Sequence, residues 1–517
     1  MGDESEVQPI ESDLLYDAFR DRKVVKDPKT LTKSKFLNGL QCPKLLWTRC
    51  NAPETIPPPS KQLQKVFDIG HQVGALAETC FPGGHHVQED DFLKNIDETR
   101  ALLSAKVPKP IYEAGVKAGR LYARADILRP SSEMAGAWDV IEVKCGTKVK
   151  DVYLQDVAFQ RYCYEQAGIK VGRCFLMHIN NQYVRHGDID VEEFFALEDV
   201  TDAILPYAPS MPGWVDGFLK IIDLPACPHI GIRGHCGDPY DCQMESLCWA
   251  FLPERNVLEI ARIGKKGFDL IEQGILRIVD IPDNFKLTEI QSIQRQAAVS
   301  NRAHVSRGDI AGFVKHLKYP IWNMDFETLS EAIPRFDGVK PYQQIPFQFS
   351  VHLQKSPGAV AEHFEFLHKD TTDPRLPFLK ALKACLGPDG TVLAYRMSFE
   401  RGKLEELGRS FPEYEDWCSS VTARMVDLLI PFQKQFYYHP DQHGSASLKK
   451  VLPVLVGKSY KGMAIADGGQ APAEYARVTF GEGVDSAERQ QVYKDLEAYC
   501  GLDTEAMVDL LDALRAL

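Results

Sequence analysis

The feature that most constrains this chain is a set of charged side chains placed where a sheet should bury apolar ones. The segment Leu121–Asp126 alternates polar and apolar residues, and Trp138–Lys144 is a short β-branched run that ends in charge. These patterns predict two adjacent strands or a hairpin, followed by a helix. Side chains two residues apart in a strand point to one face, so Glu142 and Lys144 share a face that Asp126 can reach from the neighbouring strand.

This combination of charges suits the hydrolysis of phosphodiester bonds. Two carboxylates at that separation can bind Mg²⁺ or Mn²⁺ through their oxygen atoms, and an adjacent lysine can orient a water molecule or stabilise developing phosphate charge. The alternative interpretation is a solvated edge strand that carries a Glu–Lys pair.

The wider pattern resembles a known family. Asp126, then Glu142-x-Lys144, then Gln160 and Tyr164 in the predicted helix match the D…ExK…QxxxY pattern of PD-(D/E)XK nucleases of the RecB and CRISPR-adaptation Fe–S type. The resemblance implies that Asp126 and Glu142 bind metal and that Lys144 activates water. It also implies that Gln160 and Tyr164 orient the nucleic-acid strand.

A histidine upstream of these strands is a further metal-ligand candidate. His71 lies in the segment 62–81, whose apolar spacing predicts a helix. Nucleases of the resembled type commonly carry a metal-binding histidine at this place. A surface histidine is the alternative.

Cysteine spacing predicts a second kind of metal site. Cys236, Cys242 and Cys248 lie in a polar loop with Gly and Pro, and Cys227 precedes them. Such a loop favours tetrahedral zinc or an iron–sulfur cluster over a buried core. Local spacing makes Cys227 the fourth ligand. The resemblance instead implies a [4Fe–4S] cluster held by these three cysteines and Cys42, which would join the beginning of the domain to its end, and we favour that arrangement.

A second pair of carboxylates follows in the C-terminal part. Asp325 and Glu327 lie two apart on a predicted strand, and the strands and helices after it follow the order of a ribonuclease-H-like domain. On the terminal helix, Tyr499 and Asp503 are i,i+4 neighbours. The hydroxyl group can therefore position an attacking water while the carboxylate binds metal.

These residues resemble the motifs of DEDD 3′–5′ exonucleases of the subclass that uses tyrosine. The segment Tyr395–Glu400 is similar to the N-x-x-F-D motif of that family, with Arg396 in place of Asn and Glu400 in place of Asp. The resemblance implies two metal ions at this site and a water held by Tyr499. The implied metal ligands are Asp325, Glu327, Glu400 and Asp503.

The chain is long enough for two or more domains, at 517 residues. We expect an α/β protein that resembles a bacterial two-nuclease family, in which a RecB-like Fe–S nuclease is fused to a DEDD exonuclease. The expected parts are a loose arm at 1–30, the first nuclease at 31–250, a helical linker at 251–315 and the ribonuclease-H-like domain at 316–517.

Charge and hydropathy limit the partners. A net charge of −12 argues against a protein that coats nucleic acid indiscriminately, yet it permits a basic groove, and bound metal ions add positive charge of their own. No run approaches the roughly 20 apolar residues of a membrane span, and the acidic N-terminus does not have the apolar core of a secretory signal. We therefore expect a cytoplasmic protein that does not insert into membranes.

Together these features predict a divalent-metal-dependent deoxyribonuclease acting on DNA, with single-stranded ends as substrate, in repair, recombination or defence. Two alternatives stay open at this point. One is an RNA-processing or RNA-degrading exonuclease, because such sites act on either polymer and no reader of the 2′-hydroxyl is recognisable. The other is a non-catalytic Fe–S module that binds DNA.

Overall fold

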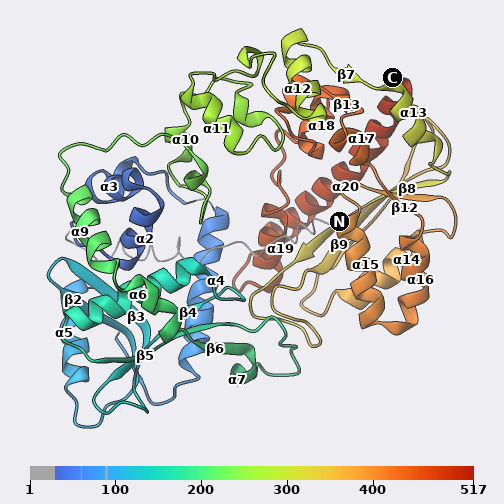
Figure 1. Cartoon of the computed structure of the whole chain (residues 1–517). Helices are drawn as coiled ribbons and strands as arrows, with labels where there is room; N and C mark the ends of the chain where they lie inside the picture. The colour runs from blue at the N-terminus through green and yellow to red at the C-terminus, as the bar shows by residue number, and fades with distance from the viewer. Residues whose placement is uncertain (1–28, 60, 88–90) are drawn as a thin grey trace. The chain divides into compact units, whose positions relative to one another are not determined.

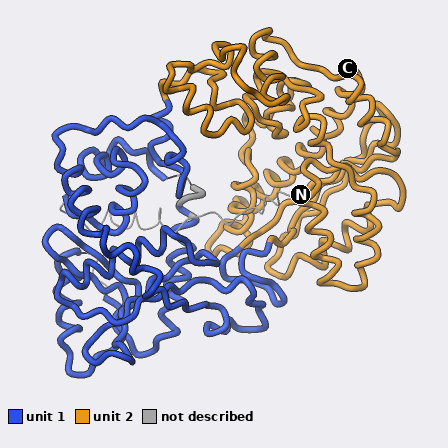
Figure 2. Tube along the Cα trace, viewed as in Figure 1, with its two compact units in different colours: residues 1–249, 331–343 blue, residues 250–330, 344–517 orange. Residues whose placement is uncertain are grey.

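The protein has a mixed α/β fold that divides into two compact units (Figure 2). The computed structural model describes residues 29–59, 61–87 and 91–517; the predicted N-terminal arm lies outside them up to residue 28. Unit 1 runs up to Trp249 and includes Glu331–Gln343, whereas unit 2 consists of Ala250–Ser330 and Gln344–Leu517. The segment predicted as a helical linker is thus grouped with unit 2.

Unit 1 contains a six-stranded sheet and the helices around it (Figure 1). Its strands are β1 (His85–His86), β2 (Ile111–Ala118), β3 (Leu121–Pro130), β4 (Trp138–Lys144), β5 (Val171–Ile179) and β6 (Phe195–Asp199). Its α-helices are α2 (Lys33–Gln41), α3 (Pro43–Asn51), α4 (Lys61–Glu78), α5 (Phe92–Leu103), α6 (Asp151–Gln166), α7 (Val191–Phe194), α8 (Thr201–Ile204), α9 (Met211–Ile222) and α10 (Glu245–Cys248). Its 3₁₀ turns are η1 (Pro53–Thr55), η2 (Leu205–Tyr207) and η3 (Gly234–Cys236).

The strands of this sheet follow one another in space in their order along the chain. Strands β2, β3 and β4 are antiparallel, β4 and β5 are parallel, and β6 closes the edge antiparallel to β5. Helix α6 packs on one face, where Val157 joins the core around Val140, and α4 packs on the other, where Val73 joins Ile141. Between the short helices α7 and α8, Phe195–Asp199 pairs with β5 as an edge strand.

Helices α2 and α3 follow the local sequence signals closely. The Thr32 side chain accepts a hydrogen bond from the Lys35 amide and so caps α2. Pro43 occupies the first turn of α3, where its missing N–H costs nothing. Cys42 ends the first helix and precedes the second, so this cysteine stands at a fixed corner of the backbone.

Unit 2 contains a five-stranded sheet and a two-stranded one. Its strands are β7 (His304–Val305), β8 (Ile321–Leu329), β9 (Ile345–Gln354), β10 (Glu362–Leu367), β11 (Thr391–Ala394), β12 (Met425–Asp427) and β13 (Tyr437–Tyr438). Its α-helices are α11 (Lys265–Glu272), α12 (Glu289–Ser300), α13 (Arg307–Lys315), α14 (Arg375–Cys385), α15 (Ser398–Ser410), α16 (Glu415–Thr422), α17 (Ile430–Gln433), α18 (Leu448–Leu455), α19 (Gln470–Phe480) and α20 (Ser486–Ala516). Its 3₁₀ turns are η4 (Val257–Glu259), η5 (Ile278–Asp280), η6 (Pro412–Tyr414) and η7 (Pro440–Gln442).

The larger sheet of unit 2 has the order β10-β9-β8-β11-β12. Strands β8, β11 and β12 are parallel, and β9 is antiparallel to both of its neighbours. Helices α14, α15 and α16 pack their apolar side chains against Met324 and Val351 on one face. On the other face the 31-residue helix α20 lies close to β8 and β9 (Figure 1).

Across the described residues, no helix combines the length and the apolar character that crossing a lipid bilayer requires.

Candidate metal and catalytic sites

The charged side chains of β4 form a buried network in unit 1. Glu142 and Lys144 are 1% and 2% exposed. Glu142 Oε1 accepts hydrogen bonds from Lys144 Nζ at 2.8 Å and from Lys33 Nζ at 2.7 Å, while its Oε2 accepts one from Gln160 Nε2 at 2.7 Å. Lys144 Nζ also donates to Asp156 Oδ2 at 2.9 Å. The alternative of a solvated edge strand is therefore wrong, because β4 is internal to the sheet and these groups are buried.

The ion pairs decide the charge state of Glu142. Burial alone raises the pKa of a carboxyl group, but the ammonium groups of Lys144 and Lys33 outweigh burial and hold the pKa of Glu142 well below its ordinary value. The carboxylate is consequently ionised at neutral pH and can serve as an oxygen ligand.

Asp126 reaches the same end of the sheet from the neighbouring strand. The pairing between β3 and β4 stops at Ile127 opposite Ile141, and beyond it Asp126 Oδ2 accepts a hydrogen bond from the Val143 amide at 2.8 Å. The carboxylate therefore lies at the fork between the strands, next to the backbone of the Glu142-x-Lys144 motif. This confirms the predicted juxtaposition of Asp126 with that motif.

Gln160 and Tyr164 both point from α6 into the protein, and each is fully buried. The Gln160 amide holds Glu142 and donates to Asp156 Oδ1 at 3.0 Å. The Tyr164 hydroxyl donates to the Ala114 carbonyl at 2.5 Å and accepts from the Ala125 amide at 3.2 Å. These contacts assign both side chains to holding the helix and the carboxylate in place. Their expected role in orienting a nucleic-acid strand stays a prediction.

His71 has a different environment from these residues. It lies on α4 and is exposed. Among the described residues it belongs to no group of three possible metal ligands within 4.8 Å of one another. Its predicted role as a metal ligand stays a prediction.

The four cysteines favoured as a cluster site do meet in unit 1. Cys42, Cys236, Cys242 and Cys248 all line one pocket, and Cys227 is absent from the described residues that line it. The Cys227 thiol is exposed, with its Sγ 3.9 Å from Thr48 Oγ1. The geometry therefore favours Cys42 over Cys227 as the fourth ligand.

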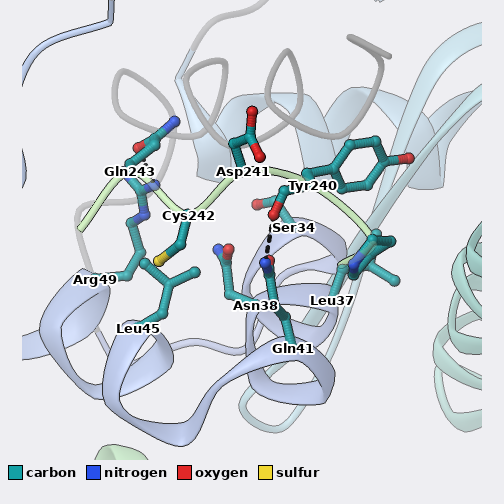
Figure 3. Close-up of a pocket in the computed structure, with 11 residues that line it drawn as sticks. Ser34, Leu37, Asn38, Gln41, Leu45, Arg49, Tyr240, Asp241, Cys242 and Gln243 are labelled. Atoms are coloured by element: carbon teal, nitrogen blue, oxygen red, sulfur yellow. Dashed lines mark hydrogen bonds between the residues drawn. The ribbon is translucent and has the colours of Figure 1, made fainter. Parts of the chain in front are cut away.

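The loop that carries Cys242 is tied to α2. A second pocket is lined by residues of both segments, and Figure 3 shows Cys242 and Gln41 among the side chains around it. Gln41 Nε2 donates to the carbonyl oxygens of Tyr240 and His235, at 2.6 and 3.0 Å. These two hydrogen bonds connect the N-terminal helix to the cysteine loop far along the chain.

The spacing of the thiols bears on which metal group fits them. Burial, together with the neighbouring thiols of Cys42, Cys236 and Cys248, raises the pKa of Cys242 to about 11. Within the described part of the chain, only three carboxylates bring three possible ligand atoms within 4.8 Å of one another. A single zinc ion with Zn–S bonds of about 2.3 Å would draw its thiolates closer than this limit. Among the described residues, no three of the four thiol sulfur atoms lie within 4.8 Å of one another.

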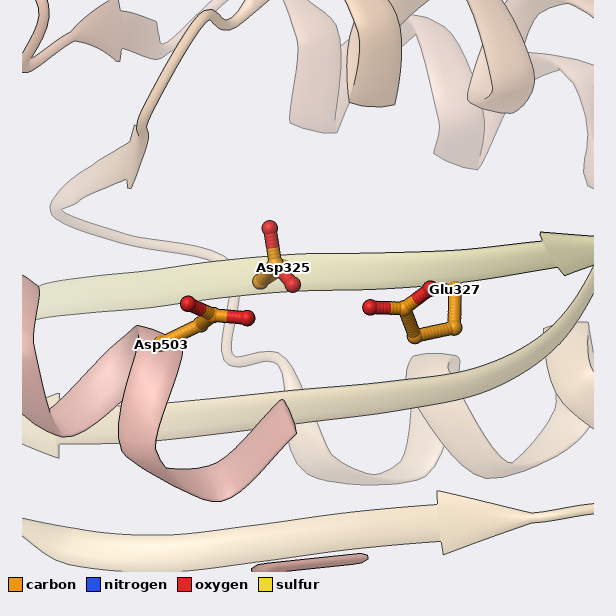
Figure 4. A group of neighbouring side chains, drawn as sticks. All are labelled: Asp325, Glu327 and Asp503. Atoms are coloured by element: carbon orange, nitrogen blue, oxygen red, sulfur yellow. The ribbon is translucent and has the colours of Figure 1, made fainter. Parts of the chain in front are cut away.

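The predicted carboxylates of unit 2 converge on one point. Asp325 and Glu327 on β8 and Asp503 on α20 each offer an oxygen atom, and these atoms all lie within 4.8 Å of one another (Figure 4). Burial and the neighbouring carboxylate charges raise the pKa values of Asp325 and Glu327 well above their ordinary values. Burial raises the pKa of Asp503 to about 6. Such crowding of like charges is the environment that a divalent cation neutralises.

Glu400, the fourth predicted ligand, lies near Asp325 but is not one of the three carboxylates whose oxygen atoms lie within 4.8 Å of one another. It lies in the first turn of α15, is 2% exposed, and its Oε2 has no hydrogen-bond partner among the described residues. Burial and then the charge of Asp325 raise the pKa of Glu400 well above its ordinary value. The substitution of Glu for the expected Asp thus still delivers a buried carboxyl group to Asp325.

The unusual Arg396 belongs to the turn that delivers Glu400. Its φ angle of 72° lies in the left-handed region, which Asn adopts more readily than Arg. Asp427 Oδ1 accepts hydrogen bonds from the Arg396 and Leu429 amides, both at 2.9 Å. Asp427 therefore fixes the backbone between β11 and α15.

Two tyrosines rather than one surround Asp503. Tyr499 hydrogen-bonds Asp503, and the Tyr460 hydroxyl donates to Asp503 Oδ1. Lys449 Nζ lies 5.3 Å from the centre of the Tyr499 ring and 5.5 Å from that of Tyr460. Burial raises the pKa values of Glu327 and Asp503, and the charge of Lys449 partly offsets this effect on both carboxyl groups.

A polar seam holds α20 on the sheet. Gln348 Nε2 donates to the Leu496 carbonyl at 2.9 Å. The Thr504 hydroxyl lies 2.6 Å from Ser350 Oγ and 2.8 Å from His352 Nδ1. Because Thr504 follows Asp503 directly, these hydrogen bonds determine how closely Asp503 approaches β8.

Sequence reasoning missed three residues that contact these sites: Lys33, Asp156 and Tyr460. Asp156 precedes Gln160 by one helical turn, so the i,i+4 spacing on α6 could have revealed it. Tyr460 lies in a segment that carries no recognisable motif. Lys33 precedes Glu142 by 109 positions, and no local pattern connects them.

Comparisons with known proteins add little to this geometry. The family model described as "Domain of unknown function (DUF2779)" matches residues 322–447. No curated protein matches the chain. Among solved structures, the chain is similar to the one described as "Crystal structure of SSO0001", with 11% sequence identity, 42% of this chain and 96% of that chain covered, and a TM-score of 0.20. At this TM-score the similarity supports no conclusion about fold or function.

Proposed function

We propose that this protein is a divalent-metal-dependent nuclease with one catalytic centre in each unit, hydrolysing phosphodiester bonds of DNA at single-stranded ends. The observation that carries the proposal is the convergence of Asp325, Glu327 and Asp503 within 4.8 Å, with the buried Glu400 beside them. A group of buried carboxylates with raised pKa values is costly unless a cation neutralises it. The sheet order β10-β9-β8-β11-β12 supports the ribonuclease-H-like interpretation of this unit.

In unit 2, Asp325, Glu327, Glu400 and Asp503 would hold the metal ions. Bound Mg²⁺ or Mn²⁺ would supply charge stabilisation for the attacking and leaving oxygens. Tyr499 positions the attacking water through its hydroxyl, and Tyr460 holds Asp503 in the orientation that this water requires. Lys449 is the nearby cation that can contact the phosphate.

In unit 1, Asp126 and Glu142 would bind the metal, which polarises the phosphate there. Lys144 lies 2.8 Å from Glu142 Oε1, close enough to orient a water molecule beside that carboxylate. Gln160 fixes the second oxygen of Glu142. The PD-(D/E)XK interpretation rests on these contacts and on Asp126 at the strand fork.

We also propose that Cys42, Cys236, Cys242 and Cys248 bind a [4Fe–4S] cluster. The common pocket of the four thiols supports this assignment, and their spacing favours it over zinc. The cluster would join α2 to the loop before α10 and so stabilise unit 1.

The proposed function is tested by degradation of end-labelled single-stranded DNA by anaerobically purified protein. We would compare Mn²⁺, Mg²⁺ and EDTA for the wild-type protein and for Lys144→Ala, Asp325→Ala and the double variant. Two separable losses are expected, with complete loss in the double variant. If none of the variants changes the rate, the degradation is a contaminant and the chain binds nucleic acid without cutting it. A parallel RNA substrate decides between the two polymers.

A further inference from the structure

Lys33 is the buried cation of unit 1 that the catalytic motif does not include. It is the first residue of α2 and 8% exposed, and its Nζ lies 2.7 Å from Glu142 Oε1. Lys144 Nζ lies 2.8 Å from the same oxygen. One carboxylate oxygen thus receives two ammonium groups.

Lys33 is placed against the electrostatic preference of its own helix. A positive charge in the first turn of a helix is opposed by the helix dipole. The ion pair with Glu142 compensates the burial of the ammonium group, which would cost several kcal/mol for an unpaired ion. Lys144 is shared between Glu142 and Asp156, so Lys33 supplies the second ammonium group of the network.

The formal charge of the network around Glu142 would change sign when a divalent metal ion binds. Three carboxylates, Asp126, Glu142 and Asp156, lie in the network or beside it, and the two ammonium groups of Lys33 and Lys144 leave a formal charge of −3 + 2 = −1. A divalent cation would change this sum to +1. An ammonium group 2.7 Å from Glu142 Oε1 would then be repelled from the oxygen that the cation needs.

We propose that Lys33 is a second basic residue of the first site, and this rests on the function proposed above for unit 1. Its ammonium occupies the cation position on Glu142 Oε1 while the site is empty. When a divalent metal and a phosphodiester bind, the flexible side chain moves, and its ammonium group contacts a non-bridging phosphate oxygen in place of Glu142. Lys33 would then be a catalytic residue that contacts the substrate phosphate.

Lys35 offers a matched control on the same helix. It is also buried, at 6% exposure, but its Nζ donates to the Thr30 carbonyl at 2.9 Å. Lys33→Met and Lys35→Met each remove one buried ammonium from α2. The first removes the ammonium group that contacts Glu142, and the second removes the ammonium group that contacts the Thr30 carbonyl.

The experiment measures Mn²⁺ affinity by isothermal titration calorimetry and cleavage of 5′-labelled single-stranded DNA, both in an Asp325→Ala background that removes the site of unit 2. We expect Lys33→Met to bind Mn²⁺ at least about fivefold more tightly than Lys35→Met, because a competing cation is gone. We expect its kcat to fall by about 100-fold. Lys33→Arg, which keeps the charge, should retain the Mn²⁺ affinity of the parent protein and part of its activity.

Equal or weaker Mn²⁺ affinity of Lys33→Met relative to Lys35→Met would overturn the proposal, because a structural lysine predicts that result. Tighter Mn²⁺ binding with unimpaired kcat would overturn it as well, since the phosphate contact would be absent. If no activity in this background depends on Lys144, the proposed function of unit 1 fails, and the Mn²⁺ titration alone then decides whether Lys33 occupies the cation position. Thermal unfolding of each variant shows whether it is folded.

Discussion

Asp126 Oδ2 accepts a 2.8 Å hydrogen bond from the Val143 amide where strands β3 and β4 separate. The carboxylate therefore completes the end of the sheet and is also a candidate metal ligand, and two substitutions distinguish these roles. Asp126→Asn keeps a hydrogen-bond acceptor but removes the charge, so metal-dependent cleavage by unit 1 should be lost while the melting temperature changes little. Asp126→Ala should lose the same activity and also about 1–3 kcal/mol of unfolding free energy, because the Val143 amide is left unpaired.

Both variants are compared by thermal unfolding in EDTA and by DNA cleavage in the Asp325→Ala background. Full activity of Asp126→Asn would show that the carboxylate serves the strand fork alone.

Glu400→Gln should make the metal-free protein more stable. Replacing this buried carboxyl group relieves its repulsion with Asp325, so the melting temperature of unit 2 in EDTA should rise. The stabilisation gained from added Mn²⁺ should shrink, because one ligand is missing. Differential scanning calorimetry with and without Mn²⁺ measures both effects. Glu405→Gln on the exposed side of α15 is the control, and a Glu400→Gln protein that responds to Mn²⁺ like this control would remove Glu400 from the metal site.

Lys449→Ala should reduce the exonuclease rate of unit 2 by about 100-fold without reducing its Mn²⁺ affinity. Its ammonium is held over two tyrosine rings that face the carboxylates, a position from which it can contact substrate phosphate. The exposed Lys450 on the same helix is the control. Rates are measured in the Lys144→Ala background. Equal rates for Lys449→Ala and Lys450→Ala would show that the ammonium contributes only to folding.

Cys42→Ser should lose the iron of the anaerobically purified protein, whereas Cys227→Ser should retain it. Cys42 lines the pocket shared by the other three thiols, and Cys227 is exposed outside it. Iron and sulfide analysis together with visible absorbance measures the difference. If Cys227→Ser loses the iron instead, Cys227 is the fourth ligand in place of Cys42. A parent protein that contains zinc and no iron would contradict the cluster assignment.

The buried imidazole of His352 should make the stability of unit 2 depend on pH. Burial and the adjacent His363 ring lower the pKa of His352 to about 4, against an ordinary value near 6.5. The unfolded chain therefore takes up a proton that the folded protein excludes, and stability is lost as the pH falls from about 6.5 to 4. Replacing His352 with Gln should flatten the melting temperature over this window. Replacing the exposed His316 with Gln is the control, and identical pH profiles for both variants would contradict the assignment.

Much of the fold was predictable from local signals. The Thr32 cap, Pro43 in the first turn of a helix, and the apolar run that becomes β8 all act over a few residues, so one sequence suffices to find them. The edge strand β6 was not predictable in this way, because its ordering depends on pairing with β5 rather than on its own pattern.

The residues of the candidate sites also differ in whether local sequence or tertiary packing determines their positions. Asp325 and Glu327 were identifiable because alternation along one strand reveals a shared face. Tyr460 was not, because a loop tyrosine carries no periodic signal and its meeting with Asp503 is set by how α18, α19 and α20 pack. The local motif also assigned Tyr164 to substrate, whereas the fold buries its hydroxyl against two backbone groups.

Helix α2 begins with Lys33 in the Glu142 network and ends at Cys42 in the thiol pocket. Its length, at about 1.5 Å per residue, and its rotation of about 100° per residue together determine where both ends point. Inserting or deleting one residue between them would turn Lys33 away from Glu142 while Cys42 stayed with the other thiols. The helix is thus a spacer of fixed length and phase, and the number of residues between Lys33 and Cys42 is as much a part of the site as their identity.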